Sequence, residues 1–140
     1  MDTIYTAEAL STGGGRTGRA SVPAAGLDLA MAPPKEMGGS GEGANPEQLF
    51  AAGYAACFHS ALQGAARQRK VSLGDSSVGA RVSLARDDEG GVGLAVVLEV
   101  VIPDVPHDVA QELADAAHQV CPYSNATRGN VEVTVTVVED

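Results

Sequence analysis

The sequence predicts one α+β domain over residues 1–140, built from mostly antiparallel sheets and one long central helix. The expected elements follow the order strands, helix, strand hairpin, helix and strand, which is typical of this class. Valine-rich segments alternate with polar residues as strands do, whereas a run from 48 to 66 carries no charged side chain and follows a helix-start signal. At 140 residues, the chain can bury a core without disulfides or metals.

The first elements are short strands. Residues 3–10 alternate as a strand does and lead into a glycine-rich turn that carries Arg16 and Arg19. Residues 20–32 predict two further strands joined by a turn at residues 25–26. Strands this short are not stable alone, so we expect a partner chain to complete them.

A glycine- and proline-rich segment over residues 33–44 predicts an irregular, mobile loop that leads to the long helix. Asn45 is a good N-cap residue, and Gln48 stands where a capping box places Glu or Gln. Glu47 in the first turn favours the positive end of the helix dipole. We expect this helix to end near Lys70.

The second half of the chain predicts a hairpin, a helix and a last strand. Residues 77–102 read as two long strands around a turn at 87–91, and residues 130–140 alternate with their valines facing inward. Between them, residues 105–120 predict a helix. The helix face expected to be buried consists of Val109, Leu113, Ala116, Ala117 and Val120.

The composition excludes several classes of partner. The formal net charge of −9 opposes binding to nucleic acid and to anionic membrane surfaces, because few cations could neutralise phosphates. The charge-free run contains Gln48, His59 and Gln63, so we expect a buried helix and no membrane span. The first residues lack the basic and apolar regions of an export signal, which predicts a cytoplasmic protein.

The chain has two cysteines, Cys57 within the charge-free helix and Cys121 after the second helix. A lone buried cysteine is as readily a small packing residue as a nucleophile. Pro122 biases Cys121 away from helical geometry, and a new turn beginning there would leave the thiol at a helix N-terminus, where a thiolate is favoured. Permanent disulfides are rare in the cytosol, so any pairing is expected to be transient. If the two positions converge, they suit a peroxidatic and resolving pair.

A reactive cysteine needs a cationic neighbour, because the thiolate is the nucleophile. Arg16, Arg19 and Arg128 are the candidates, and Glu47 is the natural carboxylate to hold one of them. Glu47 is equally well explained as a favourable charge at the start of the helix.

The histidines and glycines carry no stronger signal. His59 is two residues from Cys57, so its side chain lies on nearly the opposite helix face and cannot form a Cys–His pair. His107 and His118 lack metal-ligand spacing, which predicts no metal site. The glycine-rich runs match neither a phosphate loop nor a dinucleotide fingerprint, so no bound cofactor is expected.

Four motifs together resemble one known family. They are NPEQLFAAGYAACF at 45–58, VCPYSNATRGNV at 120–131, TGGGRTGRA upstream and GEGANPEQ between. Across essentially the whole chain they are similar to the organic hydroperoxide resistance branch of the Ohr/OsmC family. Two positions depart from the family pattern: Thr17, where relatives often carry Asp, and His59, where they are usually apolar.

This resemblance implies an Ohr/OsmC-like fold and a thiol peroxidase that reduces alkyl and lipid hydroperoxides to alcohols. Cys57 matches the family's peroxidatic cysteine and Cys121 its resolving cysteine. Arg16 matches the catalytic arginine, and Glu47 matches the carboxylate that partners it. The resemblance also implies an intertwined homodimer with two interfacial active sites, whose disulfide is reduced by dihydrolipoyl groups of lipoylated proteins.

Helix geometry places Glu47 and Cys57 about 15 Å apart along the axis and about 80° apart around it. We therefore expect Arg16 and Glu47 to serve the Cys57 of the other subunit. An apolar approach to the sulfur would favour an alkyl tail over hydrogen peroxide. The residues expected to line this approach are Phe50, Tyr54, Met37 and Leu49.

Three alternatives stay open from the sequence. An OsmC-type peroxidase would have a broader substrate range, although the stretch at 121–130 favours the organic hydroperoxide branch. A redox sensor would use the same reversible disulfide with little turnover. A thiol hydrolase is disfavoured, because no histidine is placed to assist Cys57.

Overall fold

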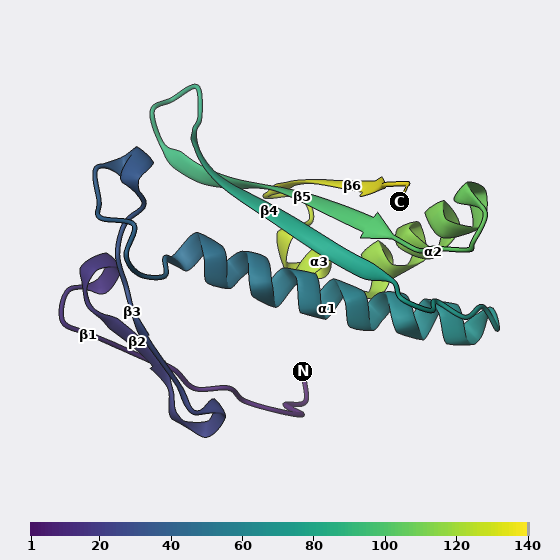
Figure 1. The fold of residues 1–140 in the computed structure, drawn as a ribbon, viewed down its shortest axis with the longest axis horizontal. Helices are drawn as coiled ribbons and strands as arrows, with labels where there is room; N and C mark the ends of the chain where they lie inside the picture. The colour runs from purple at the N-terminus through teal and green to yellow at the C-terminus, as the bar shows by residue number, and fades with distance from the viewer. Residues whose placement is uncertain (140) are drawn as a thin grey trace. The chain divides into compact units, whose positions relative to one another are not determined.

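The computed structural model describes residues 1–139, which divide into two compact units, Met1–Leu49 and a second unit that begins at Phe50 (Figure 1). The first unit holds an antiparallel sheet in the order β1-β2-β3. Its strands are β1 (Leu10–Thr12), β2 (Arg19–Val22) and β3 (Leu27–Ala30). Gly26 takes a left-handed φ of 65° between β2 and β3, which confirms the predicted turn. The single domain over 1–140 stays a prediction.

The strand expected over residues 3–10 is wrong, because only Leu10 belongs to β1. Leu10 pairs with Ser21, so an extension of β1 toward the N-terminus would run past Val22, where β2 ends. Pro23 follows there, begins a 3₁₀ turn and has no N–H to donate. The alternating residues before Leu10 therefore lack a ladder partner among residues 1–139.

The 33–44 segment is largely irregular, as predicted, with a single 3₁₀ turn at Lys35–Met37. The long helix that follows it, α1 (Pro46–Gln68), begins where the sequence predicts. The Gln48 N–H donates to the Asn45 side chain at 2.9 Å, and the Asn45 N–H donates to the Gln48 side chain at 3.0 Å. This reciprocal pair is the predicted capping box. The helix ends just before the predicted Lys70, whose φ of 57° is left-handed and closes the last turn.

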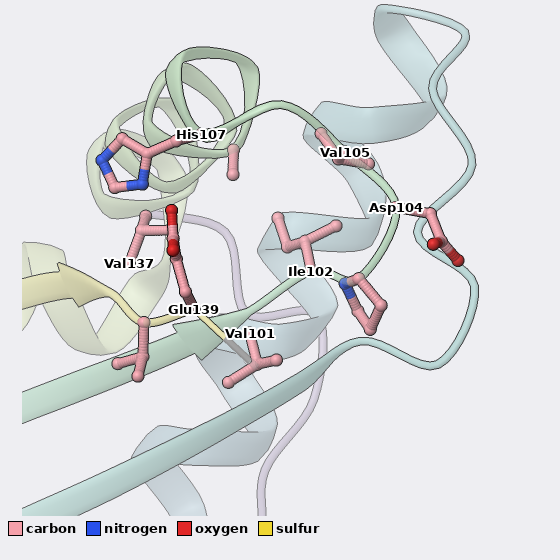
Figure 2. A pocket seen from close by; sticks show the side chains of 10 residues that line it. Val101, Ile102, Asp104, Val105, His107, Val137 and Glu139 are labelled. Atoms are coloured by element: carbon pink, nitrogen blue, oxygen red, sulfur yellow. The ribbon is translucent and has the colours of Figure 1, made fainter.

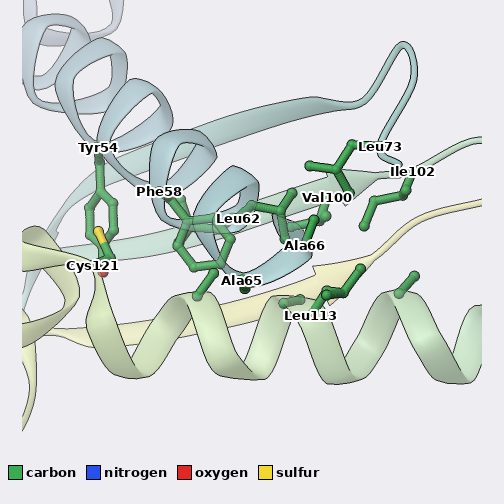
Figure 3. Packing of buried hydrophobic residues seen from close by; sticks show 14 of the residues in the cluster. Tyr54, Phe58, Leu62, Ala65, Ala66, Leu73, Val100, Ile102, Leu113 and Cys121 are labelled. Carbon is green, nitrogen blue, oxygen red and sulfur yellow. The ribbon is translucent and has the colours of Figure 1, made fainter. Parts of the chain in front are cut away.

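The second unit holds a sheet in the order β4-β5-β6. Strands β4 (Ser77–Arg86) and β5 (Val92–Val101) form the predicted antiparallel hairpin, whereas β6 (Glu132–Val137) runs parallel to β5. Helices α2 (His107–Val120) and α3 (Pro122–Thr127) connect β5 to β6. Figure 3 shows how α1 and α2 enclose a core with this sheet. The largest fully buried side chains there are Tyr54, Phe58, Leu62, Leu98 and Leu113.

Most of the predicted buried face of α2 is confirmed: Leu113 and Ala117 are fully buried, and Val109 and Ala116 are partly buried against the core. Val120 is the exception. The fully or nearly fully buried residues are Ala110, Leu113, Ala114 and Ala117, and Val120 is 67% exposed. Alanines let α2 approach the core closely, and the stripe they form continues into the buried Cys121. Because neighbouring residues on a helix diverge by about 100°, burying Cys121 turns Val120 outward.

Truncation of the core provides a test of this helix orientation. Leu113→Ala is expected to lower the free energy of unfolding by about 2–5 kcal/mol, because it empties a fully enclosed site. Val120→Ala on the same helix is the matched control and is expected to change it by less than about 0.5 kcal/mol. Urea unfolding of both variants measures the difference, and equal losses would contradict the buried stripe.

Within the described part of the chain, no helix combines the length and the apolar character needed to cross a bilayer.

Candidate active site

The two cysteines meet inside the second unit. The Cys121 Sγ lies 3.5 Å from the Cys57 Sγ, so the predicted convergence is confirmed. Cys121 is fully buried among core residues, whereas Cys57 is only half-buried. A disulfide has an S–S length of about 2.0 Å, so both are thiols here and a small approach would join them.

Cys121 occupies a corner between two helices. Its N–H donates to the Ala117 carbonyl at 2.8 Å, and its carbonyl accepts from the Asn125 N–H at 2.9 Å. It is therefore both the C-cap of α2 and the N-cap of α3, with the extended ψ of 124° that a following proline favours. The prediction that Pro122 begins a new turn is confirmed.

The surroundings of Cys57 favour its thiol form. Burial raises the pKa of the Cys57 thiol above its usual range, and the neighbouring Cys121 sulfur raises it further. The Tyr123 backbone N–H opposes this by stabilising a thiolate. At neutral pH these groups leave the sulfur largely protonated, so a nucleophilic Cys57 requires an additional cation.

In the first unit, Arg16 and Glu47 form a bidentate ion pair. The Arg16 Nη1 and Nη2 donate to Glu47 Oε2 and Oε1 at 2.9 and 2.7 Å. These hydrogen bonds lower the pKa of Glu47 and raise that of Arg16. The stabilisation from the carboxylate is therefore present above the pKa of an unfolded glutamate and is lost as the pH falls through the lower folded value.

The other two candidate cations have different partners. Arg19 pairs with Asp28 at 3.0 Å on the exposed surface of the first sheet. Arg128 donates to the His118 carbonyl at 2.7 Å. Of the three arginines, Arg16 is thus the one that Glu47 holds. Positive φ values at Gly13, Gly14 and Gly15 shape the turn that presents it.

Three aromatic rings form a cluster next to the cysteines. The ring centroids of Tyr54 and Tyr123 are 5.7 Å apart, and Phe50 lies 6.2 Å from Tyr54 and 6.4 Å from Tyr123. Gly53 leaves room for this packing, because a Cβ there would lie 3.2 Å from the Tyr123 hydroxyl. Sequence reasoning had missed Tyr123, although its place in the second cysteine motif was a signal. Met37, also expected near the sulfur, belongs to the first unit and is 51% exposed.

A second feature that sequence reasoning had missed is a group of polar side chains around Cys121. Ser124 Oγ lies 2.8 Å from the Tyr54 hydroxyl and 2.7 Å from His118 Nδ1. The Tyr54 hydroxyl also lies 3.2 Å from Thr127 Oγ1. Burial lowers the pKa of His118, the nearby Arg128 lowers it further, and Asp115 opposes both.

Comparison with known proteins adds independent evidence. Residues 39–136 match the OsmC-like protein family. The chain is also 49% identical to the organic hydroperoxide resistance protein of Xanthomonas axonopodis pv. citri, over 96% of this chain and 94% of that protein. The chain belongs to the organic hydroperoxide resistance branch of the OsmC-like family. The resemblance found in the sequence motifs is therefore confirmed.

Solved structures of organic hydroperoxide resistance proteins are also similar to this chain. An organic hydroperoxide resistance protein from Elizabethkingia anophelis, with thiocyanate bound, superposes with a TM-score of 0.92 at 47% identity over 100% of both chains. A putative family member from Vibrio cholerae, with captopril bound in one of its active sites, gives 0.89 at 47% identity over 98% of this chain and 94% of that chain. The predicted α+β, OsmC-like fold is thereby confirmed.

The ring of His59 has a hydrogen-bond partner at the far end of the loop that follows α1. Its Nε2 lies 2.9 Å from the Ser76 hydroxyl, in the connection between α1 and β4. This hydrogen bond joins His59 to a residue other than Cys57. Among residues 1–139, no three histidine, cysteine or carboxylate side chains gather as metal ligands.

A cavity of about 180 Å³ lies at the end of β5 and the start of α2 (Figure 2). Val101, Ile102 and Val105 give it an apolar wall, and His107 and Glu139 stand beside it. Neither cysteine contributes to its lining. This cavity is therefore separate from the place where Cys57 and Cys121 meet.

Proposed function

We propose that this protein is a thiol peroxidase that reduces alkyl and lipid hydroperoxides to alcohols. The observation that carries the proposal is the 3.5 Å approach of Cys57 and Cys121, which suits an attacking and a resolving thiol. Membership of the organic hydroperoxide resistance branch supports this substrate class.

The cycle has two chemical steps. The Cys57 thiolate attacks the distal peroxide oxygen, the O–O bond breaks, and the alkoxide takes a proton to leave as the alcohol. Cys57 is now a sulfenic acid. The Cys121 thiol then attacks that sulfur, water leaves, and a disulfide forms before further peroxide can drive Cys57 to the sulfinic acid.

Arg16 is proposed to stabilise the thiolate and meet the negative charge that develops on the leaving oxygen. Glu47 holds the guanidinium flat and in place, a geometry that a lysine ammonium cannot copy. We further propose that the protein is a homodimer in which this pair serves the Cys57 of the other subunit. The helical spacing of Glu47 and Cys57 supports that arrangement.

Heterodimers test the assignment across subunits. A Cys57→Ser subunit combined with an Arg16→Met subunit leaves one intact site if the arginine acts across the interface. If every dimer contains one subunit of each variant, about half of wild-type activity is expected. Each variant alone is expected to be inactive. No recovery in verified heterodimers would show that both residues act within one chain.

The substrate side is proposed to be apolar. Phe50, Tyr54 and Met37 remain the residues proposed to contact the alkyl tail, together with Leu49. Phe50 is partly exposed beside Tyr123 and is therefore the better supported of the two rings, whereas Tyr54 is fully enclosed. Contact with such rings favours a hydrophobic tail over hydrogen peroxide, which has none to bury.

The disulfide is proposed to be reduced by dihydrolipoyl groups of a lipoylated protein in the cytoplasm, with no bound cofactor. Because Cys121 is enclosed by the core, the half-buried Cys57 sulfur is the accessible point of attack for an external dithiol. The Cys121 thiolate would then be the leaving group.

Steady-state turnover with dihydrolipoamide tests the function. Cumene hydroperoxide is expected to be consumed at least about tenfold faster than hydrogen peroxide, since burial of ~60 Å² of apolar tail is worth ~1.5 kcal/mol. Disulfide formation without sustained turnover would favour a redox sensor instead. Equal rates with both peroxides would favour an OsmC-type peroxidase of broader range, and hydrolysis of a chromogenic ester would favour a thiol hydrolase.

A further inference from the structure

Hydrogen bonds connect four polar side chains next to the two cysteines: Tyr54, His118, Ser124 and Thr127. Tyr54 lies three residues before Cys57 on α1, whereas His118 and Ser124 lie three residues before and after Cys121. Tyr54 and Ser124 are fully buried, so their hydroxyls have only protein partners. The group therefore ties α1 to the α2–α3 corner at the point where the two sulfurs meet.

The contacts allow only one assignment of donor and acceptor to each hydrogen bond in this group. The Thr127 hydroxyl donates to the Ser124 carbonyl at 3.1 Å, because a carbonyl can only accept. Thr127 Oγ1 has then used its proton, so the Tyr54 hydroxyl at 3.2 Å must donate to it. The single Tyr54 hydroxyl proton is then used in the bond to Thr127, so the Ser124 hydroxyl donates to the Tyr54 oxygen at 2.8 Å.

The last link concerns His118. Since the Ser124 proton is committed to Tyr54, Ser124 Oγ can only accept from His118 Nδ1 at 2.7 Å. The ring must therefore carry a proton on Nδ1. A neutral His118 is then the Nδ1–H tautomer, and protonation of the ring would leave this hydrogen bond in place.

We propose that this directed chain, from His118 through Ser124 and Tyr54 to Thr127, holds Cys121 against Cys57 and makes His118 a positioning residue for disulfide formation. The inference rests on the proposed peroxidase function. The step it assists is the attack of the Cys121 sulfur on the Cys57 sulfenic acid, in which an S–S bond forms, the S–O bond breaks and water leaves.

The physical reason is competition between two reactions of the sulfenic acid. Sulfurs held 3.5 Å apart need only a small movement to react, so resolution is fast. If the α2–α3 corner moves away from α1, the two sulfurs are in contact in a smaller fraction of molecules. A second hydroperoxide then has more time to oxidise the Cys57 sulfenic acid to the sulfinic acid. His118 touches neither sulfur through a hydrogen bond of its own, so its effect passes through Ser124.

The proton order is tested by ¹⁵N–¹H correlation of the histidine rings in reduced wild-type protein near pH 8, where His118 is neutral because its pKa is lowered. The chain has three histidines, and a His118 variant assigns the signals. Nδ1–H is the expected tautomer. An Nε2–H tautomer would reverse the chain and overturn the inference. Because this measurement uses no peroxide, it is independent of the proposed function.

The positioning role is tested by the products of oxidation. His118→Leu keeps bulk but removes the donor, whereas His118→Asn places an amide N–H close to the former Nδ1. At one fixed concentration of cumene hydroperoxide, intact mass measures the ratio of sulfinic acid to disulfide. His118→Leu is expected to raise this ratio about fivefold, the rate equivalent of one hydrogen bond of ~1 kcal/mol, and His118→Asn to raise it less than about twofold.

Controls separate positioning from general loss of stability. Both variants are compared well below their melting temperatures, and Ser124→Ala provides a second break in the same chain that leaves His118 unchanged. Ser124→Ala is expected to match His118→Leu. An unchanged ratio in folded His118→Leu and Ser124→Ala would overturn the positioning role. A wild-type protein that cumene hydroperoxide does not oxidise would instead overturn the proposed function.

Discussion

Cys57→Ser is expected to reduce hydroperoxide consumption to the rate measured without protein. A serine hydroxyl at this half-buried position has no accessible anion at neutral pH, and it cannot form the sulfenic acid on which the cycle depends. Dihydrolipoamide-driven turnover of cumene hydroperoxide is the measurement. Activity that survives this substitution would remove Cys57 from the chemistry.

Cys121→Ser is expected to fail differently. The first equivalent of peroxide still oxidises Cys57, because the attacking sulfur is intact, but no internal disulfide can follow. Sustained turnover stops, and intact mass shows sulfinic acid on Cys57. The exposed Val120 next to it supplies a control, since Val120→Ala should leave both steps unchanged. Normal turnover in Cys121→Ser would show that an external thiol resolves the sulfenic acid.

The second large effect is expected at the ion pair. Arg16→Lys removes the two-pronged contact with Glu47 and is expected to lower the rate of Cys57 oxidation by about 10²–10³-fold, the usual cost of losing a donor to a developing oxyanion. Glu47→Gln leaves the arginine less firmly oriented and is expected to act in the same direction. Arg19→Lys is the matched control, because that side chain pairs on the exposed surface with Asp28.

The same variants are expected to move the thiol titration. Without the proposed help from Arg16, burial dominates and the pKa of Cys57 rises. The thiolate then forms only at higher pH, so the remaining activity of Arg16→Lys recovers as the pH increases. Thiolate absorbance in a Cys121→Ser background measures the shift. Coincident titrations with and without Arg16 would show that another group activates the sulfur.

Local signals in the sequence were enough to predict the elements that carry the site. Asn45 and Gln48 satisfy each other at the start of α1, and Pro122 ends α2 beside Cys121, because both effects depend on residues close together in the chain. The link between Arg16 and Glu47 was one of three possibilities for the cation. The family resemblance singled out Arg16, and the structure shows the contact that residue types and spacing alone left open.

Long-range features lay beyond sequence reasoning. The Tyr54–Ser124 hydrogen bond joins residues 70 positions apart, and no local pattern marks it. Four of the five residues predicted on the buried face of α2 lie in or against the core, but Val120 is exposed because the helix turns Cys121 inward instead. Residues 3–10 alternate like a strand, but alternation alone does not supply a ladder partner, and β2 ends too early to provide one.

The most direct test of the two-cysteine peroxidase is a single turnover of reduced protein with one equivalent of cumene hydroperoxide. The expected result is one equivalent of the alcohol and a protein lighter by two hydrogen atoms, with a Cys57–Cys121 linked peptide after proteolysis. Loss of the peroxide without that linkage, or the linkage without the alcohol, would contradict the proposed cycle.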